Sequence, residues 1–231
     1  MDFFDAIGQA LYQAFIEDNR YILILRGLGN TLIIALFATI IGTIIGLCVA
    51  IIKVLTHNNR KLRIFSWICD VYITVIRGTP VAVQLLIMYG SILLFIDDSV
   101  KVAIITFGIN SGAYVAEIVR AGILAVDQGQ TEAGRSLGLT QGMTMRSIVL
   151  PQAFKNILPA LGNEFIALLK ETSIAGYIAC MDLTKAANNI YTRTFNVAPL
   201  YIVAVIYLLL VMCMTFLLKR VERRLSKSDH R

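Results

Sequence analysis

Long runs without a charged residue dominate the pattern of this chain. The run from Gly27 to Ile52 has 26 residues and the run from Thr194 to Leu218 has 25, with no Asp, Glu, Lys or Arg in either. A helix of about 20 apolar residues is enough to cross the hydrocarbon of a bilayer. A third uncharged run, Gly78 to Ile96, adds 19 residues. The pattern predicts an all-α membrane protein.

Five transmembrane helices are predicted in a single domain that covers residues 1–231. They lie at about 28–53, 80–96, 100–124, 159–181 and 199–218. The segment before the second crossing, Ile64 to Ile76, is expected to be a helix that lies at the membrane interface or enters the bilayer at a tilt. Pro80 removes a backbone donor and disfavours helix at the residue before it, so a hinge or a helix restart is expected at Arg77-Gly78-Thr79-Pro80.

Positive charge is distributed unevenly between the two ends of these helices. If the helices alternate in direction, 15 of the 21 Lys and Arg residues fall on one side, whereas the other side has five bases and seven acids. Because Lys and Arg accumulate in cytoplasmic loops, the N-terminus is expected outside and the C-terminus inside. The net charge of +6 is therefore attributed to orientation and anionic lipid rather than to nucleic acid.

A polar loop of 23 residues, 129–151, joins the third and fourth predicted helices on the cytoplasmic side. Long loops between helices usually carry function. Residues 131–137 are predicted to form a short helix with Glu132 in its first turn, where a carboxylate suits the positive helix end. Gly138 is expected to stop that helix, and Thr140 to cap a second one.

Small residues in the first of these helices, Ala133 and Gly134, would let another surface come close. The helix pair is therefore suited to docking into a groove on a partner. A structured connecting loop without a partner explains the same residues, so the loop alone does not decide between the two.

The spacing of the loop motif resembles the EAA loop of ABC-importer permeases. The motif consists of Glu132-Ala133-Gly134, then Gly138, then Ile148-Val149-Leu150-Pro151, with Gly134 where alanine is usual. Three further segments resemble the polar amino acid uptake family of these permeases, of the histidine, glutamine and arginine type. These segments are 77–80 with Gln84 and Leu85, 111–122, and 158–173.

The resemblance implies a permease subunit of the bacterial cytoplasmic membrane that imports polar amino acids. It implies a second permease subunit, identical or related, together with ATP-binding cassette ATPase subunits and an external amino-acid-binding protein. The residues that it assigns to coupling with the ATPase are Glu132, Ala133, Gly134, Arg135 and Gly138. The chain has no GxxxxGK[ST] phosphate loop, so ATP and Mg²⁺ are expected on the ATPase subunits and no cofactor on this chain.

Polar residues interrupt the fourth predicted helix. An ionisable group in hydrocarbon costs at least ~2.5 kcal/mol on insertion scales, so such groups are expected to face a cavity or pair with each other. Counted from Pro159 at about 1.5 Å per residue, Glu171 would lie near the middle of the bilayer. The predicted substrate pathway comprises Asn163, Glu164, Lys170, Glu171, Thr172, Ser173 and Gln84. Alternatively, Glu171 pairs with a distant Lys or Arg and holds the bundle together.

Two further patterns bear on packing. Glu117 and Arg120 are three residues apart, and an ion pair or a position facing the loop is expected for them. The glycine pairs 42/46 and 108/112 have a spacing that lets helices approach closely. Packing within one subunit and packing between subunits both account for these pairs.

Two other function classes fit the sequence less well. A secondary transporter often shows inverted repeats, and none is visible in five helices. An intramembrane enzyme would need a nucleophile, a base or a metal cluster. The four cysteines have no CxxC spacing, and the two histidines, His57 and His230, are far apart in sequence, so neither residue type predicts a metal or redox site. An ATP-driven importer permease is the function that the sequence favours.

Overall fold

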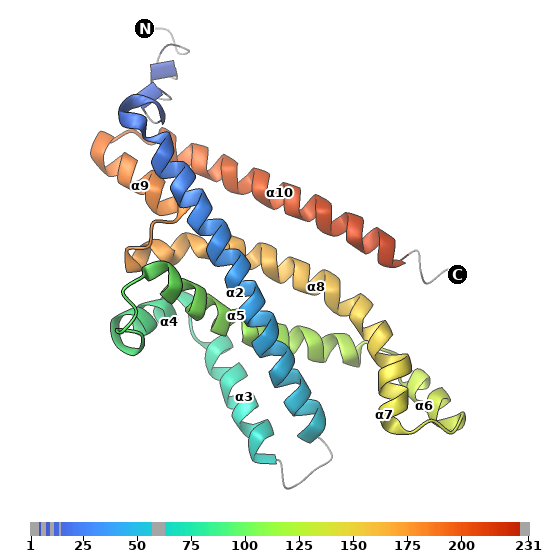
Figure 1. Cartoon of the computed structure of the whole chain (residues 1–231). Helices are drawn as coiled ribbons and strands as arrows, with labels where there is room; N and C mark the ends of the chain where they lie inside the picture. Colours follow the sequence, from blue (N-terminus) through green and yellow to red (C-terminus); the bar gives the residue numbers. More distant parts are fainter. Residues whose placement is uncertain (1–4, 6–7, 10–11, 14, 57–62, 227–231) are drawn as a thin grey trace.

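The computed structural model describes residues 5, 8–9, 12–13, 15–56 and 63–226, and these form helices and turns without a strand. The four longest helices described are α2 (Tyr21–Thr56), α5 (Ser99–Leu124), α8 (Leu150–Glu171) and α10 (Ala198–Ser226), and in the view of Figure 1 α2 runs more steeply than the other three. The expected all-α class is confirmed. Several residues that entered the sequence argument lie outside the described residues: Asp2, His57, Arg60, Lys61, Lys227, Asp229, His230 and Arg231.

The most extensive helix contact in the described structure joins α2 to α5. Glycines let the two backbones come together. A Cβ atom added to Gly42 would lie 2.8 Å from Cβ of Ser111, and one added to Gly46 would lie 2.5 Å from Cγ1 of Val115. Carbon atoms in contact normally sit about 3.5–4.0 Å apart, so no larger residue fits without movement.

The glycines of α5 make the reciprocal contact. An added Cβ at Gly108 would lie 2.7 Å from Cγ2 of Ile41, and one at Gly112 would lie 2.8 Å from Cγ2 of Ile45. Both glycine pairs therefore pack inside one subunit, which decides between the two explanations that the sequence left open.

The main apolar core lies where α2, α4 (Val81–Ile87), α5, α8 and the 3₁₀ segment η5 (Thr172–Ile178) meet. Phe107 of α5 is fully buried at its centre. The other buried members are Ile34, Ala35, Ala38, Leu85, Leu93, Val102, Ala103, Leu168, Leu169, Ala175, Ile178 and Cys180. The core thus joins helices from both halves of the chain.

The helix break that proline predicts is present. Helix α3 (Arg63–Gly78) stops before Pro80, which has extended geometry (φ −63°, ψ 132°), and α4 starts at Val81. The α3 axis and the axis of 81–92 differ by 105°. Gln84 stabilises this corner, because its amide nitrogen donates to the carbonyl of Ile76 (2.7 Å) and to Oγ1 of Thr79 (2.8 Å). The corner is therefore hydrogen-bonded as well as bent.

Within the described residues, three helical segments are long and apolar enough to cross a membrane, and a fourth crossing results if one bent helix pair counts as a single span. They are Glu17–Val54, Ser99–Leu124 and Ala198–Leu225, with Arg63–Gly78 plus Val81–Ile92 as the pair. The expected bounds of the third crossing are confirmed by α5. The second crossing was expected to run to Ile96, but it ends at Ile92 after the π-helical turn η3 (Met88–Ile92).

The expected fourth helix, 159–181, has the wrong bounds at both ends. Helix α8 already starts at Leu150, directly after the π-helical turn at 145–149, and Pro151 lies in its first turn. Pro159 lies inside the helix instead of starting it. The helix ends at Glu171 and continues as the 3₁₀ segment η5. Pro159, from which the depth of Glu171 is counted, is therefore not the start of the helix.

The turn after η5 is fastened to α2. Nδ2 of Asn30 donates to the carbonyl of Met181 (2.8 Å), and Oγ1 of Thr31 accepts from the amide of Leu183 (3.1 Å). Asp182 caps α9 (Leu183–Thr194) and is fully buried. Burial raises the pKa of the Asp182 carboxyl, while hydrogen bonds from the amides of Thr184 and Lys185 oppose the shift. These bonds set the position of α9 against the first long helix.

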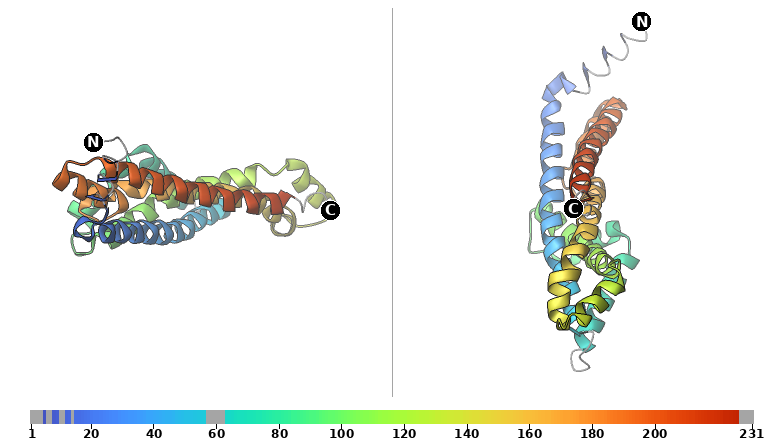
Figure 2. Two further views of the ribbon diagram at one scale, coloured as in Figure 1. Left: turned by 90° about the horizontal axis from the view of Figure 1, so that it is seen from above. Right: turned by 90° about the vertical axis from the view of Figure 1, so that its right-hand side faces the viewer.

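Helix α10 lies along the outside of the bundle, as Figure 2 shows. Only 6% of its most apolar stretch is buried within the subunit. Its exposed side chains are mostly large and apolar, including Tyr201, Val205, Leu208, Leu209, Met212 and Phe216. Such a face is expected of a helix that borders lipid or another apolar surface.

We expect Gly46→Ala to destabilise the subunit, because the new methyl group would overlap Val115 and the backbone nitrogen of Ala116. Overpacking of this kind costs about 1–3 kcal/mol. Gly29→Ala in the same helix is the matched control, because an added Cβ there meets nothing within 4 Å. Thermal unfolding in detergent measures the difference. Equal midpoints for the two variants would contradict the packing role of Gly46.

Candidate functional site

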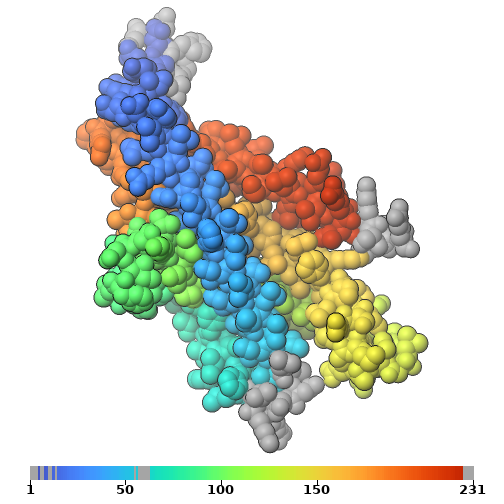
Figure 3. Space-filling model, viewed as in Figure 1, coloured from blue at the N-terminus to red at the C-terminus, as the bar shows by residue number. Residues whose placement is uncertain are grey.

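The loop between α5 and α8 forms a helical hairpin that projects from the end of the bundle, as Figures 1 and 3 show. Its first helix, α6 (Gln128–Ser136), starts three residues before the predicted Thr131. The reason is Asp127, whose Oδ1 accepts from the amide of Gly129 (2.6 Å) and caps the helix. Glu132 consequently lies beyond the first turn, and its expected place at the positive helix end is wrong.

The predicted glycine stop is confirmed. Gly138 has φ +80°, a left-handed conformation that glycine adopts without steric cost. The amide of Leu139 donates to the carbonyl of Gly134 (3.1 Å) and the amide of Gly138 to that of Arg135 (3.0 Å). This is the double hydrogen bond of a Schellman cap. Thr140 caps the second helix as expected, since its Oγ1 accepts from the amide of Met143 (3.3 Å).

Gly134 lies on the inner face of the hairpin, between its two arms. It is buried, and an added Cβ would lie 2.7 Å from Cγ2 of Thr144 in α7 (Gln141–Thr144) and 3.0 Å from Cδ1 of Ile148. The surface that comes close to Gly134 is therefore the second arm of the same hairpin, which corrects the expectation of an approaching partner at this residue. Ala133, its neighbour, is exposed.

The outer face of the hairpin combines apolar and charged side chains. Leu137 at its tip is 80% exposed and Met143 is 53% exposed. Glu132 and Arg135 are exposed beside them. Four of the five residues that the resemblance assigns to coupling thus lie at the surface: Glu132, Ala133, Arg135 and Gly138.

The hairpin is joined directly to α8. After α7 the chain continues through the π-helical turn η4 (Met145–Val149) directly into α8. The first arm is also held, because Nε2 of Gln152 in α8 donates to Oε1 of Gln130 in α6 (3.1 Å). A displacement of the hairpin would therefore be passed to α8.

Polar side chains form a layer across α5. Nδ2 of Asn110 donates to Oε1 of Gln84 in α4 (3.0 Å), and Oγ of the next residue, Ser111, donates to Oε1 of Glu164 in α8 (2.9 Å). Two predicted pathway residues, Gln84 and Glu164, are thereby brought to adjacent positions of one helix. Each is already hydrogen-bonded within the subunit.

A cluster of charges lies closer to the C-terminal end of α5. Glu117 accepts two hydrogen bonds from Arg120, at 2.9 and 2.8 Å, so the expected ion pair is confirmed. Arg77, beside the helix break, lies 3.7 Å from the same carboxylate and 5.1 Å above the ring of Tyr114. The cluster links α3 to α5.

The remaining predicted pathway residues gather where α8 passes into η5. Lys170, Glu171 and Ser173 line a cavity of about 380 Å³. Among the described residues, neither Lys170 nor Glu171 forms an ion pair, so a distant Lys or Arg does not hold Glu171 there. Thr172 is fully buried and its hydroxyl donates to the carbonyl of Leu169 (2.7 Å). Asn163, about two turns earlier in α8, is exposed.

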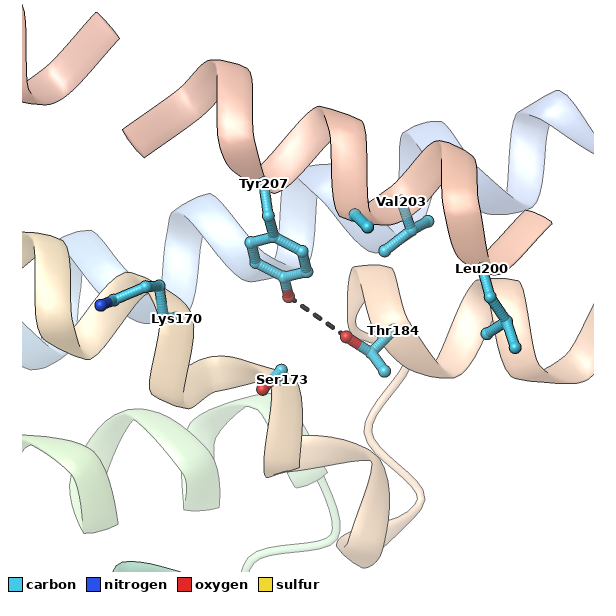
Figure 4. A pocket seen from close by; sticks show the side chains of 7 residues that line it. Lys170, Ser173, Thr184, Leu200, Val203 and Tyr207 are labelled. Atoms are coloured by element: carbon cyan, nitrogen blue, oxygen red, sulfur yellow. Dashed lines mark hydrogen bonds between the residues drawn. The ribbon is translucent and has the colours of Figure 1, made fainter. Parts of the chain in front are cut away.

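An adjacent cavity of about 360 Å³ lies between η5, α9 and α10, and Figure 4 shows it from close by. Lys170 and Ser173 line this cavity too, opposite Thr184 and Tyr207. The hydroxyl of Thr184 donates to that of Tyr207 (3.4 Å), whereas the amine of Lys170 extends away from this pair in the view of Figure 4. The sequence analysis does not single out Tyr207 or Thr184. The available signal for Tyr207 was a hydroxyl within an apolar run, and Thr184 had no such signal.

No group of three or more His, Cys, Asp or Glu side chains in the described part of the chain is arranged to hold a metal ion. The polar groups instead donate and accept hydrogen bonds at helix contacts, or line open cavities. Such an arrangement offers hydrogen-bonding groups to a polar solute.

Long apolar helices, a polar layer and a projecting hairpin define the class: a helical membrane protein with the features of a transport component. Residues 42–227 match the family described as binding-protein-dependent transport system inner membrane component, and the chain belongs to this family.

Named relatives agree with the family. The arginine transport system permease protein ArtQ of Bacillus subtilis is 43% identical over 210 residues, covering 89% of this chain and 94% of the relative. The glutamine transport system permease protein GlnP of Escherichia coli is 35% identical, with 88% and 93% covered.

Solved structures are similar as well. The crystal structure of an amino acid ABC transporter with histidines matches with a TM-score of 0.83 at 41% identity, covering 97% of this chain and 99% of that one. An inward-facing structure of the methionine ABC transporter MetNI has the same fold, with a TM-score of 0.73 at 22% identity and coverage of 88% and 96%.

We expect Gly134 and Thr144 to be energetically coupled. Gly134→Ala alone would force the stiff, β-branched Thr144 to move, whereas the double variant Gly134→Ala/Thr144→Ala removes both crowding atoms. A double-mutant cycle on thermal unfolding, with protease cleavage of the hairpin as second readout, should give an interaction of at least about 0.5 kcal/mol. Additive effects of the two substitutions would refute the packing argument.

Proposed function

We propose that this chain is the membrane permease subunit of an ATP-driven importer of polar amino acids. The observation that carries the proposal is the hairpin, whose interior is closed by its own packing while its tip presents Leu137 and Met143 to the outside. A helical surface of this kind fits a groove on a partner. Family membership supports a partner that supplies energy.

The ATPase subunits dock on this hairpin and hold ATP and Mg²⁺, and this chain binds no cofactor of its own. Their nucleotide cycle moves the hairpin, and the continuous helical path from α7 through η4 into α8 passes the movement to the polar residues near η5. Glu132, Ala133, Arg135 and Gly138 contribute to the docking surface, and Gly134 holds its shape.

Substrate passes along the α8–η5 junction, lined by Lys170, Glu171 and Ser173. Polar amino acids carry an ammonium and a carboxylate, so side chains of both signs are useful there. The named relatives for arginine and glutamine support this substrate class. Delivery requires an external amino-acid-binding protein, and a second permease subunit completes the pathway.

The chain crosses the bacterial cytoplasmic membrane five times, with α8 and η5 as one crossing, the N-terminus outside and the C-terminus inside. The excess of Lys and Arg at the ends expected to be cytoplasmic supports this orientation. It places the hairpin where an ATPase and its nucleotide are available.

A thiol-labelling experiment tests this orientation. In a background with the exposed Cys48 and Cys213 replaced by alanine, Ser136→Cys in α6 should react with a membrane-impermeant maleimide only after cells are permeabilised. Thr192→Cys in α9, also exposed, is the control and should react in intact cells. Labelling of Ser136→Cys in intact cells would overturn the orientation and with it the docking of an ATPase.

A coupling assay tests the function itself. The chain is reconstituted in proteoliposomes with its ATPase subunits and external binding protein, and amino acid uptake is compared with ATP hydrolysis. Gly138→Arg should lower the uptake per ATP, since a non-glycine residue in the left-handed conformation costs about 1–2 kcal/mol and displaces the tip. Uptake without the ATPase subunits would indicate a secondary transporter instead.

Gly142→Arg is the matched control for this assay. It adds the same charge to the same exposed hairpin, and an added Cβ meets nothing within 4 Å at either position, but only Gly138 has a positive φ. Normal coupling in Gly138→Arg, or an equal loss in both variants, would contradict the role assigned to the glycine turn.

A further inference from the structure

A third cavity, of about 370 Å³, opens where the ends of α2 and α5 meet the second arm of the hairpin. Most of its wall is apolar and includes Ala50, Val54, Ala116, Leu124 and Met145. Three polar side chains, those of Lys53, Arg120 and Gln141, complete the lining. The cavity is separate from the polar residues assigned to substrate, which lie toward η5.

The charge around this cavity favours an anion. The amine of Lys53 donates to Oδ1 of Asp70 (2.6 Å), and the guanidinium of Arg120 donates to the carboxylate of Glu117. Each cation has further N–H groups that these pairs do not use. Arg77 adds a third positive charge 3.7 Å from Glu117. Among the described side chains, three cations thus face two carboxylates, and the side chain of Arg120 is 47% exposed.

The lining has the amphipathic character of a phospholipid site. Val54 is 48% exposed and Leu124 is 68% exposed, so an apolar surface continues from the cavity to the outside of the two helices. Lys53 lies in the last turn of α2 and Arg120 in the last two turns of α5, where such helices reach the headgroup level. Clusters of Lys and Arg at this level attract anionic lipids.

We propose that this cavity binds an anionic phospholipid of the cytoplasmic leaflet. Lys53 and Arg120 hold its phosphate, Gln141 hydrogen-bonds the headgroup, and an acyl chain lies along Val54 and Leu124. The proposal rests on the orientation given under the proposed function. Because Gln141 and Met145 belong to the hairpin, the lipid bridges the ends of α2 and α5 to the coupling element.

Lipid binding to the full chain, purified in a zwitterionic detergent, tests the proposal. Native mass spectrometry compares the binding of phosphatidylglycerol with the binding of phosphatidylcholine. Each cation near an anionic lipid contributes about 1 kcal/mol, so Lys53→Gln/Arg120→Gln should weaken phosphatidylglycerol binding at least about tenfold. Arg220→Gln/Arg223→Gln, which removes two exposed cations from the end of α10, is the control and should change it less than about twofold.

A second variant keeps the charges. Val54 lines the cavity at its exposed edge, and tryptophan is tolerated at the membrane interface. The larger side chain of Val54→Trp would occupy part of the cavity and should therefore also weaken phosphatidylglycerol binding. Phosphatidylglycerol with a photoreactive headgroup should crosslink to the peptide that holds Gln141 and Met145.

Several results would overturn the proposal: equal binding of phosphatidylcholine, equal effects in the α10 control, competition by inorganic phosphate at matched concentration, or crosslinks confined to α10. Binding is measured without ATP or transport, so a negative result here leaves the proposed import function standing. Conversely, a failure of the coupling assay leaves the lipid measurement intact.

Discussion

The close approach of α2 and α5 is the constraint on which the rest of the structure depends. Glycines 42 and 46 bring the two backbones together, and α5 then presents its other faces to three further elements. Tyr72 of α3 donates to the carbonyl of Ile109 (2.6 Å), while α4 and α8 hydrogen-bond the next two residues of α5. Small residues are what make this central position possible, because in lipid helix association relies on packing and interhelical hydrogen bonds.

In the hairpin, some residues of the motif determine its conformation and others lie at its surface. Gly134 and Gly138 determine its form, the first by admitting Thr144 and the second by ending α6 in a left-handed turn. The exposed Leu137 and Met143 are then free to meet another protein. A hairpin that keeps its own geometry can push on α8 without deforming, which is what a mechanical link between subunits requires.

Intramembrane polar residues fall into two groups with different surroundings. Gln84 and Glu164 are hydrogen-bonded to α5 and contribute to the arrangement of the helices. Lys170 and Glu171 border open cavities instead, and the described structure gives them no ion-pair partner. An ionisable group in a membrane is costly unless it pairs or faces a cavity, so the position of Lys170 and Glu171 at open cavities is what supports their proposed contact with substrate.

The sequence by itself determined the helical membrane class, the break at Pro80, the bounds of α5 and the glycine stop at Gly138, because these follow from local periodicity and backbone chemistry. The sequence did not predict the start of α8, since either Pro151 or Pro159 could occupy a first turn, and the structure shows that Pro151 does so while Pro159 lies inside the helix. Tertiary structure alone decided that Gly134 faces its own hairpin and that Glu164 meets Ser111. The reason is physical: contacts between residues distant in sequence depend on how helices cross, and no local pattern encodes that angle.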